Sequence, residues 1–138
     1  MNREEIKSIL PHREPMLLVD EAEALEENKA RGRYSVKGNE WFLQGHFPGN
    51  PVVPGVMLCE MMAQTCAVLL ADRSAGFTPY FTGLNNVKFR NKVLPGDTLE
   101  IECCLLKERK PFFFAEGTGT VNGKLAVSAE FSFALVED

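Results

Sequence analysis

The chain has 138 residues, of which 45% are hydrophobic and 25% charged, values that are typical of one globular domain. Its net charge is -4, and nucleic acid is therefore not expected as the main partner, because phosphate binding requires an excess of basic residues. We expect a single domain, 1–138.

The N-terminus and the cysteines both indicate a cytoplasmic protein. Glu4 and Glu5 interrupt the place where a signal peptide carries basic and then apolar residues. The four cysteines form no C-x-x-C pair, and Cys103 directly precedes Cys104, which disfavours a zinc site and a disulfide framework. We expect reduced thiols and no bound metal.

The first third of the chain predicts a short helix and two strands. The helix is expected at 3–10, and a strand is expected to begin at 16–19. From 30 to 36, apolar or small residues alternate with polar ones, which indicates a second strand.

The middle of the chain combines a turn-rich loop with an apolar helix. The segment 45–55 contains three prolines and three glycines, and 56–71 is apolar nearly all round. Pro54 and the carboxylate of Glu60 argue against a membrane span here. We expect a helix buried within protein.

The last third predicts four strands. They are expected at 86–93, 97–107, 112–121 and 124–137, and Asn122-Gly123 is a strong hairpin turn between the last two. In the second of these strands every other residue is apolar, so Leu99, Ile101, Cys103 and Leu105 are expected to share one buried face.

Six strands and one apolar helix predict an α+β hot-dog fold, an antiparallel curved sheet wrapped around one long buried helix. Ala115, Gly117 and Gly119 share one strand face and would let the helix approach closely. An exposed edge strand favours pairing with a second copy, so a homodimer is expected.

His46 and Gly55 bracket the central loop. Pro48-Gly49 suits a type II turn directly after His46, so the loop holds one shape. Gly55 opens the helix, where free N–H groups and the helix dipole favour an oxyanion. The alternatives are an ordinary loop histidine and a tight turn into the helix.

Glu60 is the only charge in the apolar helix. An unpaired buried carboxylate is costly, so it must meet a cation, a donor or water. It either handles a proton or points at a subunit interface or a solvent gap. Gln64 follows at i+4 and either orients the carboxylate or makes a structural hydrogen bond.

A histidine, a buried carboxylate and an oxyanion donor together suit proton removal beside a thioester carbonyl and loss of a β-oxygen. No serine nucleophile motif, metal-ligand cluster or glycine-rich phosphate loop competes with this interpretation, and no cofactor is expected. His12 is interpreted as structural.

Four segments resemble one family along nearly the whole chain. They are 9–20 (ILPHREPMLLVD), 42–64 (FLQGHFPGNPVVPGVMLCEMMAQ), 87–90 (VKFR) and 93–97 (VLPGD). The sequence closely resembles the (3R)-hydroxyacyl-acyl-carrier-protein dehydratases of bacterial type II fatty-acid synthesis, the FabZ-type hot-dog enzymes.

This resemblance implies roles for the residues singled out above. His46 would remove the C2 proton, Glu60 of the partner chain, alone or through a bound water, would help the C3 hydroxyl leave as water, and Gly55 N–H would bind the thioester carbonyl. The product would be a trans-2-enoyl thioester. The family precedent for assembly is a hexamer built as a trimer of dimers with shared active sites.

The resemblance also implies substrate contacts and some departures. The substrate contacts would be Phe47, Gly55, Val56, Gln64, Tyr80 and Phe81. An acyl tunnel would be lined by Met57, Met61, Met62, Phe81 and Phe89, unless these are ordinary core residues.

Sister enzymes that isomerise the double bond carry Asp and Cys at positions 60 and 56, which favours a dehydratase without isomerase activity. Glu14 and Val53 stand where the family usually has an aromatic residue and Met.

An acidic carrier protein would require a local basic patch on this acidic chain. Lys88, Arg90 and Lys92 are expected to alternate on one strand face, with Arg109 and Lys110 near in sequence. They form either a docking patch or a solvated strand face.

Two other functions share the expected fold. A hot-dog thioesterase would hydrolyse the thioester, but the combination of His46 with Glu60 disfavours it. A non-catalytic thioester sensor would be expected to lose one of these two residues, and both are present.

Overall fold

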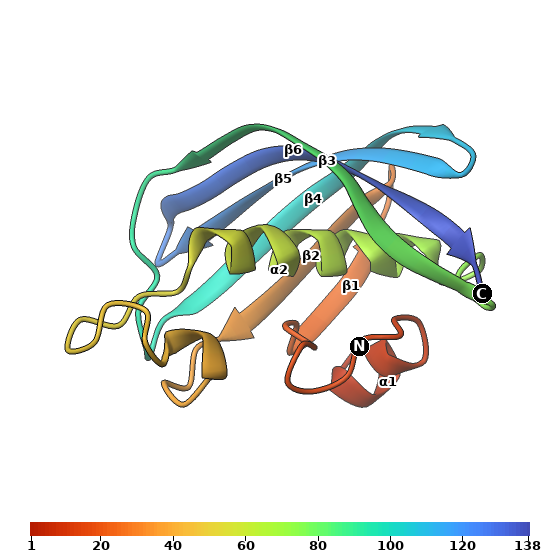
Figure 1. Cartoon of the computed structure of the whole chain (residues 1–138). Helices are drawn as coiled ribbons and strands as arrows, with labels where there is room; N and C mark the ends of the chain where they lie inside the picture. Colours follow the sequence, from red (N-terminus) through yellow and green to blue (C-terminus); the bar gives the residue numbers. More distant parts are fainter.

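The computed structural model describes residues 1–138 and contains one six-stranded antiparallel sheet curved around a long helix (Figure 1). The helical elements are α1 (Arg3–Lys7), η1 (Trp41–Leu43), α2 (Gly55–Ala67) and η2 (Val68–Leu70). The strands are β1 (Glu21–Leu25), β2 (Lys29–Ser35), β3 (Phe77–Phe89), β4 (Thr98–Arg109), β5 (Phe112–Val121) and β6 (Lys124–Glu137). They lie in the order β1-β2-β4-β5-β6-β3, so β1 and β3 are the edges. The expected hot-dog fold is confirmed.

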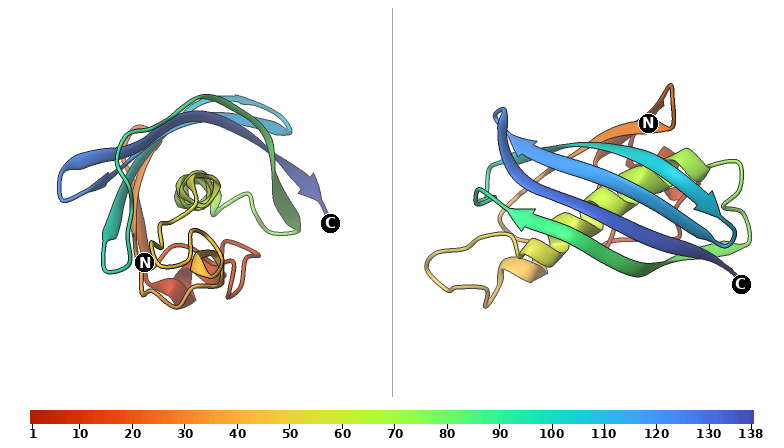
Figure 2. Two further views of the ribbon diagram at one scale, coloured as in Figure 1. Left: turned by 60° about the vertical axis from the view of Figure 1, so that its left-hand side comes forward. Right: turned by 90° about the horizontal axis from the view of Figure 1, so that it is seen from above.

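Helix α2 lies inside the curve of the sheet, as the left-hand view of Figure 2 shows. Met61, Met62 and Cys66 have no exposed surface and belong to one hydrophobic cluster of 33 buried residues. Burying a side chain of that size stabilises the fold by about 1.5–3 kcal/mol. No helix in the structure combines the length and the apolar character needed to cross a bilayer.

Glycines let the sheet approach α2 closely. A Cβ added at Gly117 would lie 3.3 Å from the Met62 sulfur, as the small-residue pattern predicted. A Cβ at Gly32 would lie 2.9 Å from the Thr65 side chain, a contact the sequence did not indicate. Gly119 was expected to face the helix, but a Cβ there would meet Leu99 and Val127 of the neighbouring strands.

The alternation predicted for β4 is confirmed, because Leu99, Ile101, Cys103 and Leu105 are all buried. The hairpin turn at Asn122-Gly123 is confirmed as well, since both residues have positive φ between β5 and β6. Strand β6 alternates less cleanly than expected: residues on both of its faces are buried over most of its length.

The first strand begins later than predicted. Segment 16–19 is mostly buried but is not part of the sheet, and its backbone hydrogen-bonds to the side chain of Gln64 instead. Strand β1 follows it and joins β2 through a turn in which Glu27 and Asn28 both have φ of 60°. That turn contains no glycine, which explains why the sequence did not reveal it.

Strand β3 also differs from its prediction of 86–93. It runs from Phe77 to Phe89, and its pairing with β6 shifts register between Phe81 and Gly83 and again between Asn85 and Lys88. Each irregularity changes which face a side chain occupies, so no simple alternation marks this strand in the sequence.

A network of charges holds the segment that precedes β1. Arg3 bonds to Asp20 at 2.8 Å and to the Leu17 carbonyl at 2.9 Å, and it pairs with Glu14 at 3.2 Å. Lys7 pairs with Glu14 from the other side at 3.1 Å. The backbone N–H of Glu14 and these two cations lower the pKa of its carboxyl to about 2. Ion pairs therefore occupy the position at which an aromatic residue was expected from the resemblance.

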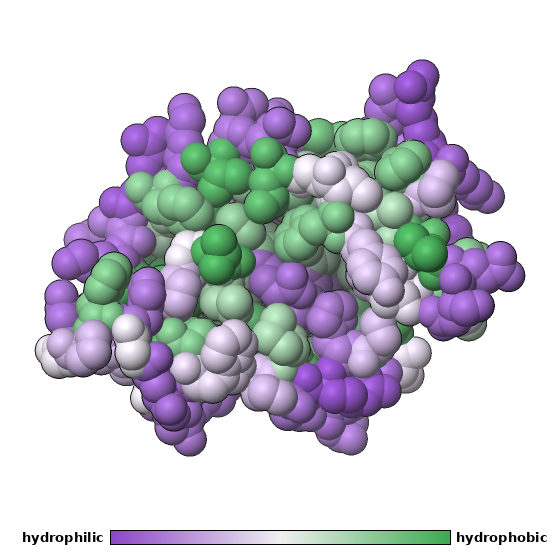
Figure 3. Space-filling view, in the orientation of Figure 1, coloured by the Kyte–Doolittle hydropathy of each residue, from purple (hydrophilic) through white to green (hydrophobic).

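The edge strand β3 exposes large apolar side chains. Figure 3 shows hydrophobic residues gathered mainly in the upper left and centre of this face, above the first turns of α2 as drawn in Figure 1. The exposed members on β3 are Phe77, Tyr80, Phe81, Leu84 and Phe89. An unpaired apolar edge of this length favours pairing with another chain.

Candidate active site

His46 lies in the loop between η1 and α2, and its ring orientation is fixed by the backbone. Nδ1 lies 2.7 Å from the carbonyl oxygen of Val52. Because a carbonyl oxygen can only accept a hydrogen bond, Nδ1 carries the proton and Nε2 keeps its lone pair. In the neutral ring, the loop therefore presents Nε2 as the nitrogen that can act as a base.

The residue after His46 is strained. Phe47 has φ of 59°, a left-handed conformation that is uncommon for a bulky residue. Its ring stacks on that of His46, with centroids 4.2 Å apart, and 57% of its surface is exposed. Gly45 and Gly49 also have positive φ, which a glycine adopts without strain. The loop is thus built to hold the imidazole beside an exposed aromatic ring.

The first turn of α2 offers free backbone N–H groups. The hydrogen bonds to the Pro54 carbonyl come from Met57 and Leu58, so the N–H groups of Gly55 and Val56 have no acceptor in the preceding turn. A Cβ at Gly55 would lie 2.7 Å from the Phe89 ring, which packs directly on this residue. A side chain at Gly55 would therefore require the Phe89 ring to shift.

Glu60 lies in the next turns of α2, and Gln64 binds its carboxylate. Gln64 Nε2 donates to Glu60 Oε2 at 2.8 Å and to the Met16 carbonyl at 2.8 Å, and its Oε1 accepts from Leu18 N–H at 2.9 Å. Both roles considered for Gln64 are thus present: it orients Glu60 and it anchors the N-terminal segment. Burial and the charge of Glu60 raise the pKa of the neighbouring Cys59 thiol.

His12, interpreted as structural from the sequence, lies against Glu60. Its Nε2 is 3.3 Å from Glu60 Oε2, and its buried Nδ1 has no hydrogen-bond partner. The sequence carried no signal for this contact, because the two residues are brought together only when the N-terminal segment folds over α2.

Two hollows lie near α2, and Glu60 lines one of them without His46 of the same chain. Glu60 and His12 line one of them with the following residues: Ala63, Gln64, Ala67, Pro79, Tyr80, Phe81 and Phe133. The other hollow surrounds the start of α2 and includes Val52, Gly55, Val56 and Phe89. The polar contacts of His46 and Glu60 do not join them.

The remaining candidate substrate contacts divide into exposed and buried residues. Val56 is 66% exposed and Tyr80 57% exposed, so both are available to a ligand. Met61 and Met62 are fully buried in the core, which matches their interpretation as core residues, and Met57 is half-buried against the same cluster.

The three cations expected on one strand face are arranged differently. Lys88 lies in β3, but Arg90 and Lys92 lie beyond its end because the strand stops at Phe89. Arg90 and Lys92 line the hollow at the start of α2, and none of the three forms an ion pair. Two unpaired cations therefore flank Gly55 and its free N–H.

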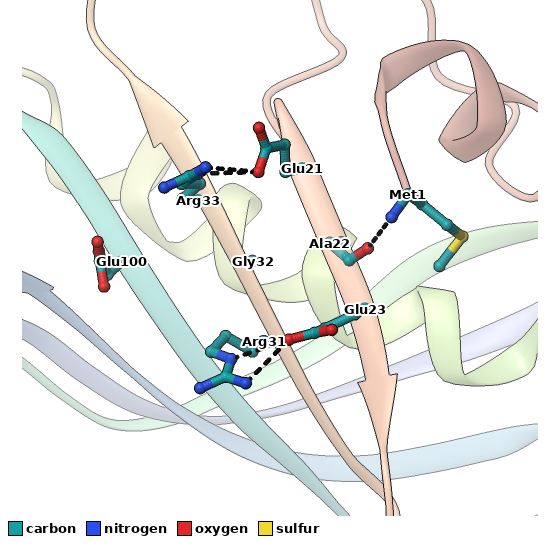
Figure 4. Close-up of a pocket in the computed structure, with 8 residues that line it drawn as sticks. All are labelled: Met1, Glu21, Ala22, Glu23, Arg31, Gly32, Arg33 and Glu100. Carbon is teal, nitrogen blue, oxygen red and sulfur yellow. Dashed lines mark hydrogen bonds and ion pairs between the residues drawn. The ribbon is translucent and has the colours of Figure 1, made fainter.

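A further hollow on the outer face of β1 and β2 is occupied by its own ion pairs (Figure 4). Arg33 pairs with Glu21 at 2.6 Å and Arg31 with Glu23 at 2.9 Å. Glu100 lines the same hollow without an ion pair. No cluster of three or more histidine, cysteine or acidic side chains could hold a metal ion.

The chain is similar in sequence to one family of proteins along most of its length. The family model described as the FabA-like domain matches residues 10–130. A 3-hydroxyacyl-acyl-carrier-protein dehydratase FabZ of Clostridium perfringens is 47% identical over 137 residues, covering 98% of this chain and 99% of its own length. The protein of the same name from Oenococcus oeni is 46% identical, with the same coverage.

Solved structures share the fold at lower identity. A chain of a dehydratase heterocomplex from Xenorhabdus doucetiae superimposes with a TM-score of 0.82 at 23% identity, covering 96% of this chain and 91% of its own. A hypothetical thioesterase of Streptococcus pneumoniae superimposes with a TM-score of 0.63 at 15% identity, covering 86% of each chain. Since both lie under 25% identity, they bear on the fold alone.

Proposed function

The chain belongs to the FabA-like family, and we propose that it removes water from a 3-hydroxyacyl thioester of acyl carrier protein to give the trans-2-enoyl thioester in fatty-acid biosynthesis. The curated relatives that match almost the whole chain are 3-hydroxyacyl-acyl-carrier-protein dehydratases by name. The residues described above supply a base, an acid and an oxyanion donor for this reaction.

The tautomer of His46 carries the proposal. With Nδ1 bound to the Val52 carbonyl, Nε2 is free to take the C2 proton of the substrate. Electrons from the C2–H bond move into the thioester carbonyl, and the Gly55 N–H stabilises the oxygen that becomes negative. Formation of the C2–C3 double bond then expels the C3 oxygen.

Glu60 completes the elimination. A protonated carboxyl at this position gives its proton to the C3 hydroxyl as the C–O bond breaks, so that the oxygen leaves as water. The proton taken by His46 and the proton lost by Glu60 balance, and solvent restores both groups. Glu60 and Val56 stand where isomerising relatives carry Asp and Cys, so the proposed product keeps its double bond between C2 and C3.

The active site is proposed to form between two copies of the chain. His46 does not line the hollow that contains Glu60 of the same chain, and the apolar edge β3 is free to pair with β3 of a second copy. Such a two-fold pairing would place Glu60 of one copy near His46 of the other. A hexamer of three such dimers remains part of the proposal.

The proposed surroundings of the enzyme are an acidic carrier protein and the cytoplasm. Arg90 and Lys92, unpaired and beside Gly55, are proposed to dock the carrier, with Lys88 as a third cation. The four cysteines are free thiols, which supports a reducing compartment.

We expect Arg90→Glu to raise KM for carrier-linked substrates about 10-fold and to change the constants for coenzyme A thioesters by less than about two-fold, because charge reversal mainly weakens steering of an acidic partner. The measurement is steady-state kinetics with both substrate forms at low salt. Lys29→Glu, a reversal on the distant strand β2, serves as the matched control. Equal losses on both substrates would rule out the docking role.

Gly55→Ala should lower kcat/KM about 10- to 100-fold, because the new Cβ collides with Phe89 and displaces the oxyanion donor. The double variant Gly55→Ala, Phe89→Ala removes the collision and should recover part of the loss. Unchanged kinetics in the single variant would contradict the expected displacement and show that the Phe89 ring moves aside instead.

The proposal is tested by the reverse reaction. Purified protein is incubated with a short trans-2-enoyl thioester, and hydration is measured as loss of the conjugated absorbance. A parallel reaction with a thiol reagent measures any thiol that is released. Hydration without thiol release supports the dehydratase. Thiol release would indicate a thioesterase. No activity on either carrier-linked or coenzyme A substrates would indicate a binding protein.

A further inference from the structure

The two oxygens of the Glu60 carboxyl have different surroundings. Oε2 lies 2.8 Å from Gln64 Nε2 and 3.3 Å from His12 Nε2. Oε1 has no hydrogen-bond partner in the chain. One oxygen is therefore hydrogen-bonded to Gln64 and approached by the His12 ring, and the other is left for a further partner.

The donor direction at Gln64 is fixed by the backbone. Its Oε1 accepts from the N–H of Leu18, and its Nε2 donates to the carbonyl of Met16. Rotating the amide by 180° would break both contacts, so Nε2 must be the atom that faces Glu60. Glu60 Oε2 is consequently an acceptor whether or not the carboxyl is protonated.

His12 adds a second nitrogen on the same side. Its Nδ1 is buried without a partner. A buried N–H without an acceptor is costly, so the favoured neutral tautomer keeps the proton on Nε2, the nitrogen that faces Glu60 Oε2. His12 therefore presents a donor to the oxygen that Gln64 already holds.

We propose that His12 is a positioning residue that acts on the substrate through Glu60. With Oε2 held by His12 and Gln64, a proton on the carboxyl resides on Oε1, and Oε1 is the oxygen that meets the C3 hydroxyl. This inference rests on the proposed function and deepens it: His12, Gln64 and Glu60 of one chain form a single acid unit that is presented to His46 of the other.

Two amide substitutions test the role of the Nε2 position. The amide nitrogen of His12→Gln can reach the place of the imidazole Nε2, whereas that of His12→Asn reaches only the place of Nδ1. We expect kcat for enoyl thioester hydration to fall about 10- to 100-fold in His12→Asn and His12→Ala, with KM within about two-fold of wild type. His12→Gln is expected to stay within about three-fold of wild type in both constants.

A double substitution tests whether His12 acts through Glu60. Glu60→Asp shortens the side chain and withdraws the carboxyl from His12 and Gln64. In that background, His12→Ala is expected to cost less than about two-fold in kcat, because residues that act as a unit are non-additive. A full additive loss would overturn the inference, since His12 would then act independently of Glu60.

The controls separate this inference from a folding defect and from the proposed function. Thermal unfolding and elution volume are compared for all variants. If His12→Ala is unstable, the comparison of His12→Gln with His12→Asn tests the positioning role. Equal activity of the Gln and Asn variants in folded protein would refute the positioning role while leaving the dehydratase intact. Absence of hydration by the wild-type protein would instead overturn the proposed function and this inference with it.

Discussion

Replacing His46 with alanine is expected to lower kcat for dehydration by about 10²- to 10⁴-fold, the usual value of a general base. The variant loses the only nitrogen that the loop presents with a free lone pair, because Nδ1 is committed to the Val52 carbonyl. Steady-state hydration of an enoyl thioester measures the effect. The fold should persist, since His46 lies in a loop outside the hydrophobic core.

Glu27→Gln is the comparison variant for this loss, because it changes an exposed side chain on the turn between β1 and β2. A His46→Ala protein that retains more than about a tenth of wild-type kcat would contradict the assignment of His46 as the base.

Glu60→Gln is expected to lower kcat to a similar extent, about 10²- to 10⁴-fold, because an amide has the shape of the carboxyl but cannot give up a proton at neutral pH. The contacts to Met16 and Leu18 are made by Gln64 and should survive, so the N-terminal segment stays in place. The measurement is kcat, with melting temperature as the check on folding.

Glu27→Gln provides the matched control for this charge removal, since its side chain is 82% exposed on the turn between β1 and β2. It should leave kcat unchanged. A Glu60→Gln enzyme as active as this control would show that proton donation comes from another group.

The architecture could be predicted because burial of one face of a strand or helix produces a regular pattern of apolar residues in the sequence. The inward face of β4 alternates without interruption, and α2 is apolar apart from Glu60, Gln64 and Thr65. Strand β3 lacked such a mark because it is an edge strand with two register shifts. Segment 16–19 looked like a strand because it is buried, but its backbone hydrogen bonds go to the side chains of Gln64 and Arg3.

The candidate site was predictable only in part. His46, Gly55 and Glu60 lie within one short stretch whose turn residues, helix start and lone charge are visible in the sequence. The contact of His12 with Glu60 joins residues that are 48 positions apart and depends on how Arg3 ties the N-terminal segment to Asp20. No local pattern records a contact of that kind. Arg90 and Lys92 were misplaced on a strand because the end of β3 was misplaced.

The most direct test of the shared active site is subunit mixing. His46→Ala and Glu60→Gln proteins are each measured alone and then after refolding together or co-expression. A mixed dimer restores one complete site, so random pairing should give about a quarter of the wild-type activity. A mixture as inactive as its two components would contradict a site built from His46 of one chain and Glu60 of the other.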